Sequence, residues 1–412
     1  MTSTPLRTIA AYFTRLGFTA FGGPLAHIAM MEEQTVRKRG WLSGRQFADA
    51  LALCQLLPGP VSTQLAIHIG YLRGGFPGAI AAGTGFILPA FFMMLGLSFL
   101  YWRYGSLPAV SALFYGLNPA VIALIAAAAL RLGRASAHSR AAVACVGTAF
   151  LARTLLGIDE ILILLGLGML GAFAPGGFTD APGSVPPSSD PPRSDRSGSS
   201  LDRQGDSIRM GTIATAGGVL SGFPLLTKAT GGAIASGMAT GVLLLTMAIF
   251  FLKAGAFMFG GGYVIVPLME TFAVEQAVLM NRSQFLDGIA LGQVTPGPIL
   301  ITATFVGYRA AGLAGSAVAT AAVFLPSFVW ILVCVPYLHR LGGWRRGRGF
   351  LAAANPAAVG TIAAAAWSLG RSCLIDSATV VIATAVLTLA LRGRASSFLL
   401  ILGAAAAGVI LS

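Results

Sequence analysis

The sequence predicts an all-α integral membrane protein with two homologous, inverted repeats, each with about five crossing helices plus one broken or re-entrant segment. Three observations lead to this fold class. Hydrophobic residues make up 56% of the 412 residues and charged residues only 10%, and the mean hydropathy is +0.80. Several apolar runs reach the roughly 20 residues that a helix needs to cross a bilayer, and they lack the alternation of a membrane barrel. Residues 13–60 recur without a gap at 251–298.

The apolar segments define the repeats, with six segments in each half. Their approximate limits in the first half are 8–31, 46–71, 76–101, 108–130, 141–157 and 160–175. In the second half they are 241–269, 284–308, 312–338, 350–370, 376–391 and 395–411. Residues 176–210 are dominated by Pro, Ser, Gly, Asp and Arg, a composition that cannot bury enough apolar surface to fold alone. We therefore expect an N-terminal repeat (1–175), a disordered linker (176–210) and a C-terminal repeat (211–412).

The distribution of basic residues predicts the topology, because cytoplasmic loops carry an excess of Lys and Arg. If every segment crossed, the basic loops 37–39 and 131–140 would lie on opposite sides of the membrane. The conflict disappears if the second segment of each half enters the membrane and returns to the same side. Both basic loops and the linker then face the cytoplasm, the loop with Glu270 and Glu275 faces outward, and the halves are inverted. The sequence leaves open whether the first segment, interrupted at Gly22–Gly23–Pro24, crosses fully.

Both halves contain the motif Pro-Gly-Pro at equivalent positions, 58–60 and 296–298. Two prolines around a glycine remove backbone donors and prevent the preceding helix from continuing. Such a break can direct the N-terminus of a half-helix toward the bilayer centre, where its free N–H groups and roughly +0.5 charge favour an anion. A structural kink is the alternative. Two motifs in register, each preceded by a matching Asp and Gln, favour a pore or binding-site element.

Charged residues at equivalent positions in or near the apolar segments are a second functional signal. A charge at the bilayer centre costs about 2.5–3.5 kcal/mol on insertion scales, so a charge repeated in both halves predicts a function if it lies deep. Arg15 and Lys253 keep a positive charge at equivalent positions despite the change of residue type, which suits an anion site. The alternative for residues close to the loop 32–45 is a place at the interface, with the side chains extending toward water.

No motif predicts an enzyme, a metal site, a cofactor or nucleic acid binding. The cysteines are isolated, without a CxxC pair or the spacing of metal ligands, and no nucleotide fingerprint follows a strand. The net charge of +13 comes from short clusters of Lys and Arg between apolar segments, where they orient a membrane protein.

Asn-Pro-Ala occurs at 118–120 and again at 355–357. This pair invites comparison with aquaporins, whose two such turns lie on inverted half-helices. The likeness extends over only three residues in each half. A channel for water or small neutral solutes therefore remains an alternative to a transporter.

The combined motifs resemble the chromate ion transporter family, in its long form with two homologous halves. They are the Gly-Gly-Pro at 22–24, the spacing of Glu32, Phe47 and Asp49, the Asp-Gln-Pro-Gly-Pro block, and the duplication itself. The resemblance covers nearly all of both halves except the linker. One departure is Gly262, which replaces the proline of the first copy, so the two glycine turns are not necessarily equivalent in function.

The resemblance implies export of chromate, and of sulfate-like tetrahedral oxyanions, across the bacterial inner membrane, with chromate resistance as the result. We expect alternating access, no cofactor, and a homodimer in the lipid bilayer; sulfate uptake is an alternative. The candidate substrate-binding or transport residues are Arg15, Gly22, Gly23, Pro24, Asp49, Gln55, Pro58, Gly59, Pro60, Lys253, Gly260, Gly261, Asp287, Gln293, Pro296, Gly297 and Pro298. The candidate coupling or gating residues are Glu32, Arg45, Asn118, Glu270 and Asn355.

Overall fold

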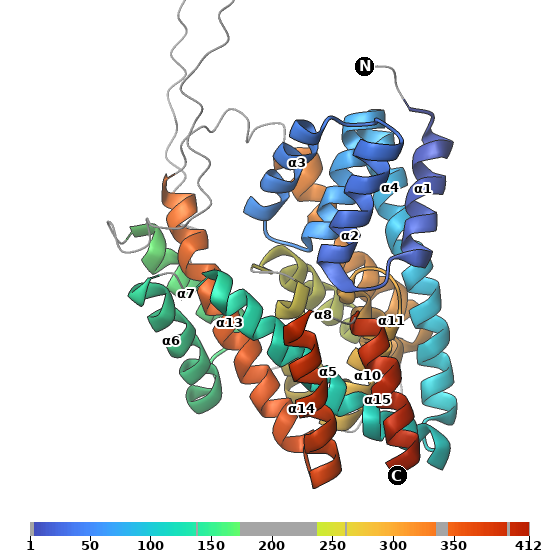
Figure 1. Cartoon of the computed structure of the whole chain (residues 1–412), viewed down its shortest axis with the longest axis vertical. Helices are drawn as coiled ribbons and strands as arrows, with labels where there is room; N and C mark the ends of the chain where they lie inside the picture. The colour runs from blue at the N-terminus through green and yellow to red at the C-terminus, as the bar shows by residue number, and fades with distance from the viewer. Residues whose placement is uncertain are drawn as a thin grey trace, which may run out of the picture.

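The computed structural model of the chain describes residues 4–136, 139–173, 237–259, 262–334, 345–393 and 396–411. The predicted linker, the apolar stretch 212–224, and Gly260 and Gly261 lie outside these ranges. Every regular element among the described residues is a helix, as the sequence predicts. The N-terminus and the C-terminus lie at opposite ends of the long axis (Figure 1).

The two halves match element by element. The first half contains α1 (Leu6–Thr19), α2 (Gly23–Glu32), the π-helix η1 (Glu33–Lys38), α3 (Gly44–Leu56), α4 (Val61–Tyr104), α5 (Pro108–Ser136), α6 (Arg140–Leu156) and α7 (Glu160–Phe173). The second half contains α8 (Gly237–Ala256), η2 (Gly262–Val264), α9 (Ile265–Glu270), the π-helix η3 (Thr271–Gln276), α10 (Arg282–Val294), η4 (Ile299–Ile301), α11 (Thr302–Val329), η5 (Trp330–Cys334), α13 (Arg345–Cys373), α14 (Ser377–Arg392) and α15 (Ser397–Leu411). Even the helix starts correspond, since α3 and α10 both begin with a capping box.

The first apolar segment turns back inside the protein. Helix α1 has 14 residues, about 21 Å, which is shorter than the roughly 30 Å of a hydrocarbon core. The chain reverses at Gly22 and Gly23, whose φ angles of 109° and 79° favour glycine. Trp41, beyond α2 and η1, packs edge-on against Tyr12 of α1 with ring centroids 5.5 Å apart. The first segment therefore enters and returns at one end of the molecule, which answers the question that the sequence left open.

The second segment also returns, as predicted. Helix α3 leads into the first PGP turn (Pro58–Gly59–Pro60), and α4 starts immediately after it. Within α4 the helical conformation is interrupted at Gly74 and Gly75. Beyond the interruption the chain doubles back, because a Cβ on Gly70 would lie 2.9 Å from the carbonyl carbon of Gly78, whereas eight residues of straight helix span about 12 Å.

Arg73 fixes both returning segments at the same end. Its guanidinium donates to the Thr4 hydroxyl at 2.9 Å and to the Trp41 carbonyl at 3.1 Å. The second half repeats this plan around the second PGP turn (Pro296–Gly297–Pro298), and α11 is interrupted at Ala311 and Gly312.

The later helices exchange partners between the halves. Helices α6 and α7 pack on α13 of the second half, and α14 and α15 pack on α5 of the first. Helix α5 also crosses α13, and α4 crosses α11. Equivalent ends of the two repeats, the end of α7 and the C-terminus after α15, point toward opposite ends of the long axis (Figure 1). This is the arrangement of inverted repeats.

A polar contact joins α5 to the start of α14. The Thr379 N–H and the Tyr115 hydroxyl donate to the Asp376 carboxylate at 2.8 and 2.7 Å. These bonds hold the pKa of Asp376 below its ordinary value. Asp376 thereby caps α14 and fixes it to the other repeat.

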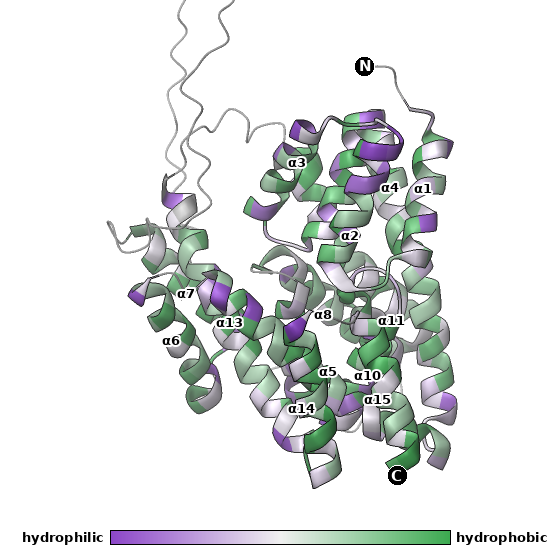
Figure 2. Cartoon of the chain, viewed as in Figure 1, coloured by the Kyte–Doolittle hydropathy of each residue, from purple (hydrophilic) through white to green (hydrophobic). Residues whose placement is uncertain are grey.

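Among the described residues, four helices are long and apolar enough to cross a membrane: Val61–Tyr104, Pro108–Ser136, Ile299–Val333 and Gly349–Cys373. Shorter apolar helices accompany them, and large apolar side chains such as Leu155, Leu170 and Ile410 are exposed. The ribbons are apolar over most of their length, while hydrophilic residues gather where α2, α3 and α4 meet (Figure 2). An exposed apolar surface of this kind suits contact with lipid.

The Asn-Pro-Ala motifs do not lie at the ends of half-helices. Pro119 lies inside α5 and Pro356 inside α13, and both helices continue through the motif. The aquaporin comparison requires these motifs at helix ends, so the geometry gives it no support.

The glycine contact inside α4 provides a stability test. Gly70→Ala would place a methyl group against the backbone of Gly78, and overpacking of this kind costs about 1–3 kcal/mol. We expect a lower thermal unfolding midpoint in detergent. Gly96→Ala is the matched control on the same helix, because a Cβ there meets nothing within 4 Å. Equal midpoints for the two variants would contradict the doubled-back path of α4.

Candidate functional site

The two PGP turns bind each other's repeat through the backbone. The Gly59 N–H donates to the Met258 carbonyl at 2.7 Å, and the Gly297 N–H donates to the Ala20 carbonyl at 3.0 Å. Ala20 and Met258 occupy equivalent positions in the two halves. The two hydrogen bonds are therefore equivalent: each runs from the PGP turn of one half to the matching carbonyl of the other half. Gly59 and Gly297 have φ angles of 128° and 108°, a region that residues with a Cβ rarely adopt.

The first PGP turn opens a buried half-helix. Ser62, Thr63 and Gln64 at the start of α4 are 2%, 0% and 0% exposed. The first N–H groups of a helix have no partner within it, so they carry a partial positive charge into the interior. The Gln64 amide donates to the Pro58 carbonyl at 2.6 Å and fixes the turn against the helix.

Three buried polar atoms near the first PGP turn have no hydrogen-bond partner in the described part of the chain. They are the Thr63 hydroxyl, the Gln64 side-chain carbonyl and the Ser327 hydroxyl of α11. Ser327 faces the turn, because a Cβ on Gly59 would lie 3.3 Å from its Oγ. Each unpaired group costs about 1–3 kcal/mol, so water or a polar solute that pairs with these groups is favoured there.

The second PGP turn has less polar surroundings. Ala90 occupies the position equivalent to Ser327, and its Cβ would lie 2.8 Å from a Cβ on Gly297. Thr302 is the first residue of α11 after this turn, and its hydroxyl donates to the Ile299 carbonyl at 3.0 Å. The backbone is therefore duplicated, but the chemistry around it is not.

The two predicted aspartates also differ. Asp287 in α10 is 7% exposed and accepts hydrogen bonds from the Tyr101 hydroxyl at 2.5 Å and the Asn118 amide at 2.7 Å. Both donors belong to the first half, so this cluster joins the repeats. Asp49 is exposed and has no hydrogen bond or ion pair within the described residues.

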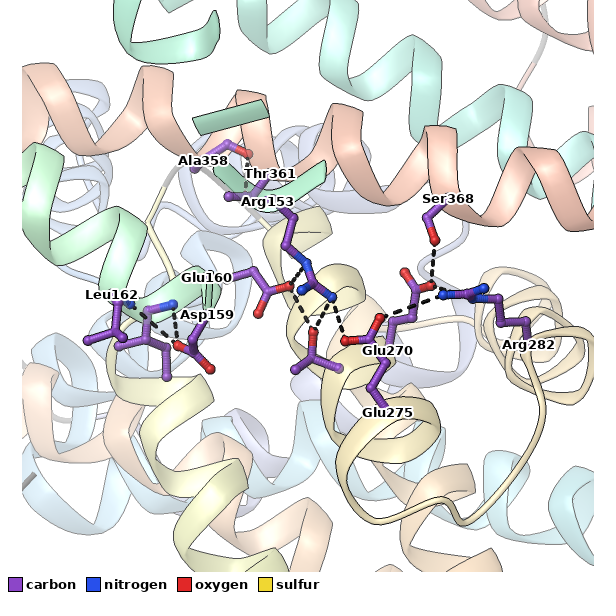
Figure 3. A network of polar contacts seen from close by, with 12 residues as sticks. Arg153, Asp159, Glu160, Leu162, Glu270, Glu275, Arg282, Ala358, Thr361 and Ser368 are labelled. Carbon is purple, nitrogen blue, oxygen red and sulfur yellow. Dashed lines mark hydrogen bonds and ion pairs between the residues drawn. The ribbon is translucent and has the colours of Figure 1, made fainter. Parts of the chain in front are cut away.

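A partly buried ionic network lies where α6 meets α7 (Figure 3). Arg153 pairs with Glu160 at 2.7 Å and with Glu275 at 2.8 Å. Arg282 pairs with Glu270 at 3.3 Å, and the Ser368 hydroxyl donates to Glu270 at 3.1 Å. Arg153 and Arg282 both reach Glu275, so the two pairs form one network. It connects α6 and α7 of the first half with η3, α10 and α13 of the second and lines a cavity of 570 Å³.

The first half does not repeat this network. The positions equivalent to Arg153, Glu160 and Arg282 are occupied by Ala390, Ser397 and Gly44. Glu32, equivalent to the buried Glu270, pairs at the surface with Arg37 at 3.9 Å. Among the described residues, one end of the molecule thus has a partly buried ionic network that the other end lacks.

The structure disperses several of the other predicted residues. Gly22 is the N-cap of α2, and Gly23 and Pro24 are its first two residues. Arg15, Arg45, Gln55 and Lys253 are exposed, whereas Gln293 and Asn355 are half-buried. No described contact joins Arg15 to Lys253, and a joint role for them in holding the substrate stays a prediction.

The sequence reasoning missed Gln64, Ser327, Arg153 and Glu160. It searched for residues repeated in both halves, and none of these four is repeated. A signal existed for two of them, because Arg153 and Glu160 lie within or beside apolar segments, where charges require partners. Among the described residues, no group of three or more His, Cys, Asp or Glu side chains is placed to hold a metal ion.

Comparison with known proteins identifies the family. A family model described as chromate transporter matches residues 7–172 and again 245–409. The chain is 33% identical to a chromate transport protein of Cupriavidus metallidurans, over 98% of this chain and 93% of that protein. It is 32% identical to a probable chromate transport protein of Synechococcus elongatus (98% and 95%) and to a chromate transport protein of Pseudomonas aeruginosa (88% and 80%). No solved structure matches the chain. Because the family model matches both halves separately and the relatives align over nearly the full length, this chain belongs to the chromate transporter family.

Proposed function

We propose that this chain exports chromate from the bacterial cytoplasm by alternating access, with the first PGP turn as its substrate site. Family membership and the names of the relatives support chromate as the substrate. The observation that carries the choice of site is the two unpaired, buried hydroxyls at the first PGP turn, those of Thr63 in α4 and Ser327 in α11. We assign the end with residues 37–39 to the cytoplasm, following the positive-inside rule.

The first PGP turn offers the donors that a tetrahedral dianion requires. The hydroxyls of Thr63 and Ser327 and the first N–H groups of α4 can all donate, and the helix dipole favours negative charge. These donors are neutral, so they hold the anion without a permanent ion pair and allow it to leave. Sulfate has the same shape and charge, and the same donors would bind it.

The asymmetry between the halves supports alternating access. The ionic network lies at the proposed outward end, and Asp287 lies buried between Tyr101 and Asn118. On the proposed cytoplasmic side, the equivalent Asp49 and Gln55 are exposed. In an inverted repeat, exchanging the conformations of the halves would open the outward end and close the cytoplasmic end.

The membrane potential favours export. At an interior potential of −100 mV one charge is worth about 2.3 kcal/mol, so an exported dianion gains about 4.6 kcal/mol. Uptake would need at least two coupled cations to offset this term. Export therefore needs no further energy source.

The direct test is chromate accumulation in everted membrane vesicles. We expect an interior-positive potential to drive uptake, with an equilibrium ratio that approaches roughly 10³ at 100 mV, and excess sulfate to compete. Vesicles that hold folded protein but accumulate no chromate under this potential would contradict the proposal.

The substrate site predicts the effect of removing its hydroxyls. Thr63→Val together with Ser327→Ala should lower kcat/KM for chromate by about 10²–10⁴-fold, because two hydrogen bonds are removed and each bond to a charged group is worth about 1.5–3 kcal/mol. The measurement is the initial rate in everted vesicles at matched protein levels. Thr388→Val is the control, since this hydroxyl is exposed and only bonds the Thr384 carbonyl of its own helix. A wild-type rate in the double variant would contradict the proposal that the first PGP turn is the substrate site.

The ionic network predicts that substitution of Arg153 lowers the thermal unfolding midpoint much more than substitution of Arg37, an arginine that forms a surface ion pair. The Arg153 and Glu160 side chains are 14% and 0% exposed, and removal of one partner of a buried pair costs about 3–5 kcal/mol. Arg153→Gln should therefore markedly lower the thermal unfolding midpoint in detergent. Arg37→Gln is the matched control, because Arg37 and Glu32 are 70% and 45% exposed and such pairs contribute about 1 kcal/mol at most. Similar midpoints for the two variants would show that the network does not stabilise the fold.

A further inference from the structure

A second pocket is lined by residues of α1 and by Arg39, at the end of the molecule with residues 37–39. Arg7 and Arg15 of α1 and Arg39, which follows η1, line a cavity of 380 Å³ with Thr8 and Tyr12. Arg7 and Arg15 are eight residues apart, which corresponds to about 12 Å along the helix. Arg39 lies over the Tyr12 ring, with its guanidinium carbon 5.1 Å from the centroid. We name this cavity the basic pocket.

The charge of the basic pocket is not neutralised by the described part of the protein. No carboxylate lines it, and none of its three arginines forms an ion pair with a described acidic residue. The neighbouring cations behave differently, since Arg37 and Lys38 both pair with Glu33. Three guanidinium groups around one cavity give it a positive potential, which favours an anion there.

A second observation also indicates a ligand in the basic pocket. The Tyr12 side chain lines the cavity and is only 5% exposed, yet its hydroxyl has no hydrogen-bond partner within the described residues. A buried hydroxyl without a partner costs about 1–3 kcal/mol. An anion that bridges the arginines would supply an acceptor for it.

We propose that the basic pocket binds a phosphate-type oxyanion, supplied by the headgroup of an anionic phospholipid or by a free tetrahedral oxyanion. Guanidinium groups match the oxygens of phosphate with paired hydrogen bonds, which a lysine cluster does not do. The cavity also exceeds the size of one small ion, so the glycerol part of a lipid fits beside the phosphate. The end assigned to the cytoplasm faces the leaflet where anionic lipids attract basic residues. This site is separate from the first PGP turn and does not depend on transport.

The test is an equilibrium titration of the purified full chain in neutral detergent at about 0.15 M salt. The probes are short-chain phosphatidylglycerol, short-chain phosphatidylcholine and sodium sulfate, with tryptophan fluorescence as the readout because Arg39 also lies over Trp41. We expect phosphatidylglycerol to bind and phosphatidylcholine not to bind. In the triple variant Arg7→Gln, Arg15→Gln, Arg39→Gln, the apparent affinity for phosphatidylglycerol should fall at least about 10-fold. This salt concentration is chosen because it screens the attraction of lipid to general surface charge beyond about 8 Å, so that the loss reports on the pocket.

A charge-matched control separates the pocket from the general charge of this end. The variant Arg37→Gln, Lys38→Gln, Arg45→Gln removes the same three charges near the same surface and should bind phosphatidylglycerol within about twofold of wild type. Sulfate that binds or displaces the lipid, with the same dependence on the triple variant, identifies a free oxyanion as a ligand. Lipid binding that sulfate does not affect identifies the headgroup. Equal binding by both triple variants, each with the elution profile and unfolding midpoint of wild type, or no binding by wild type, would overturn the proposal.

Discussion

Backbone donors in a bilayer have no water to bind, and the two PGP turns depend on each other for this reason. Each turn breaks a helix deep in the protein and leaves a glycine N–H that its own segment does not pair. The Met258 carbonyl accepts the bond from Gly59, and the Ala20 carbonyl accepts the bond from Gly297. The acceptor Ala20 directly follows the end of α1, and the acceptor Met258 follows the end of α8. The broken helices are therefore compatible with a membrane only as a reciprocal pair, and the remaining helices pack around that pair.

Symmetry in the backbone leaves room for asymmetry in the side chains. A bond between an N–H and a carbonyl requires no particular side chain at the acceptor, which explains how alanine and methionine fill equivalent positions. The differences that matter chemically occur around this conserved backbone. Ser327 faces the first PGP turn where its counterpart Ala90 faces the second, and Asp287 is buried while Asp49 is exposed. The duplicated scaffold holds two broken helices, and only the first has unpaired, buried hydroxyls beside its turn among the described residues.

Periodicity and repetition predicted the helical class, the duplicated halves and the return at the first PGP turn, because these depend on local composition and on proline chemistry. The return at Gly22 and Gly23 was left open, since glycine permits either close packing or a reversal, and the contacts of Arg73 and Trp41 that decide it are distant in sequence. The candidate site was predicted only in part. Repetition in both halves identified Asp287 and the PGP motifs. Gln64 and Ser327 have no matching residue in the other half, and only the tertiary fold brings them together.

The exchange of helices between the halves has a consequence for how the chain is made. Helices α6 and α7 pack mainly on α13. Helix α13 is synthesised only after the long intervening segment and the first part of the second repeat. Until then their inner faces contact lipid or the insertion machinery. Assembly therefore proceeds in two stages, with α1 and α4 pairing early and the crossing of α5 with α13 completed late. A chain truncated before α13 would leave the first repeat inserted but without its closing contacts.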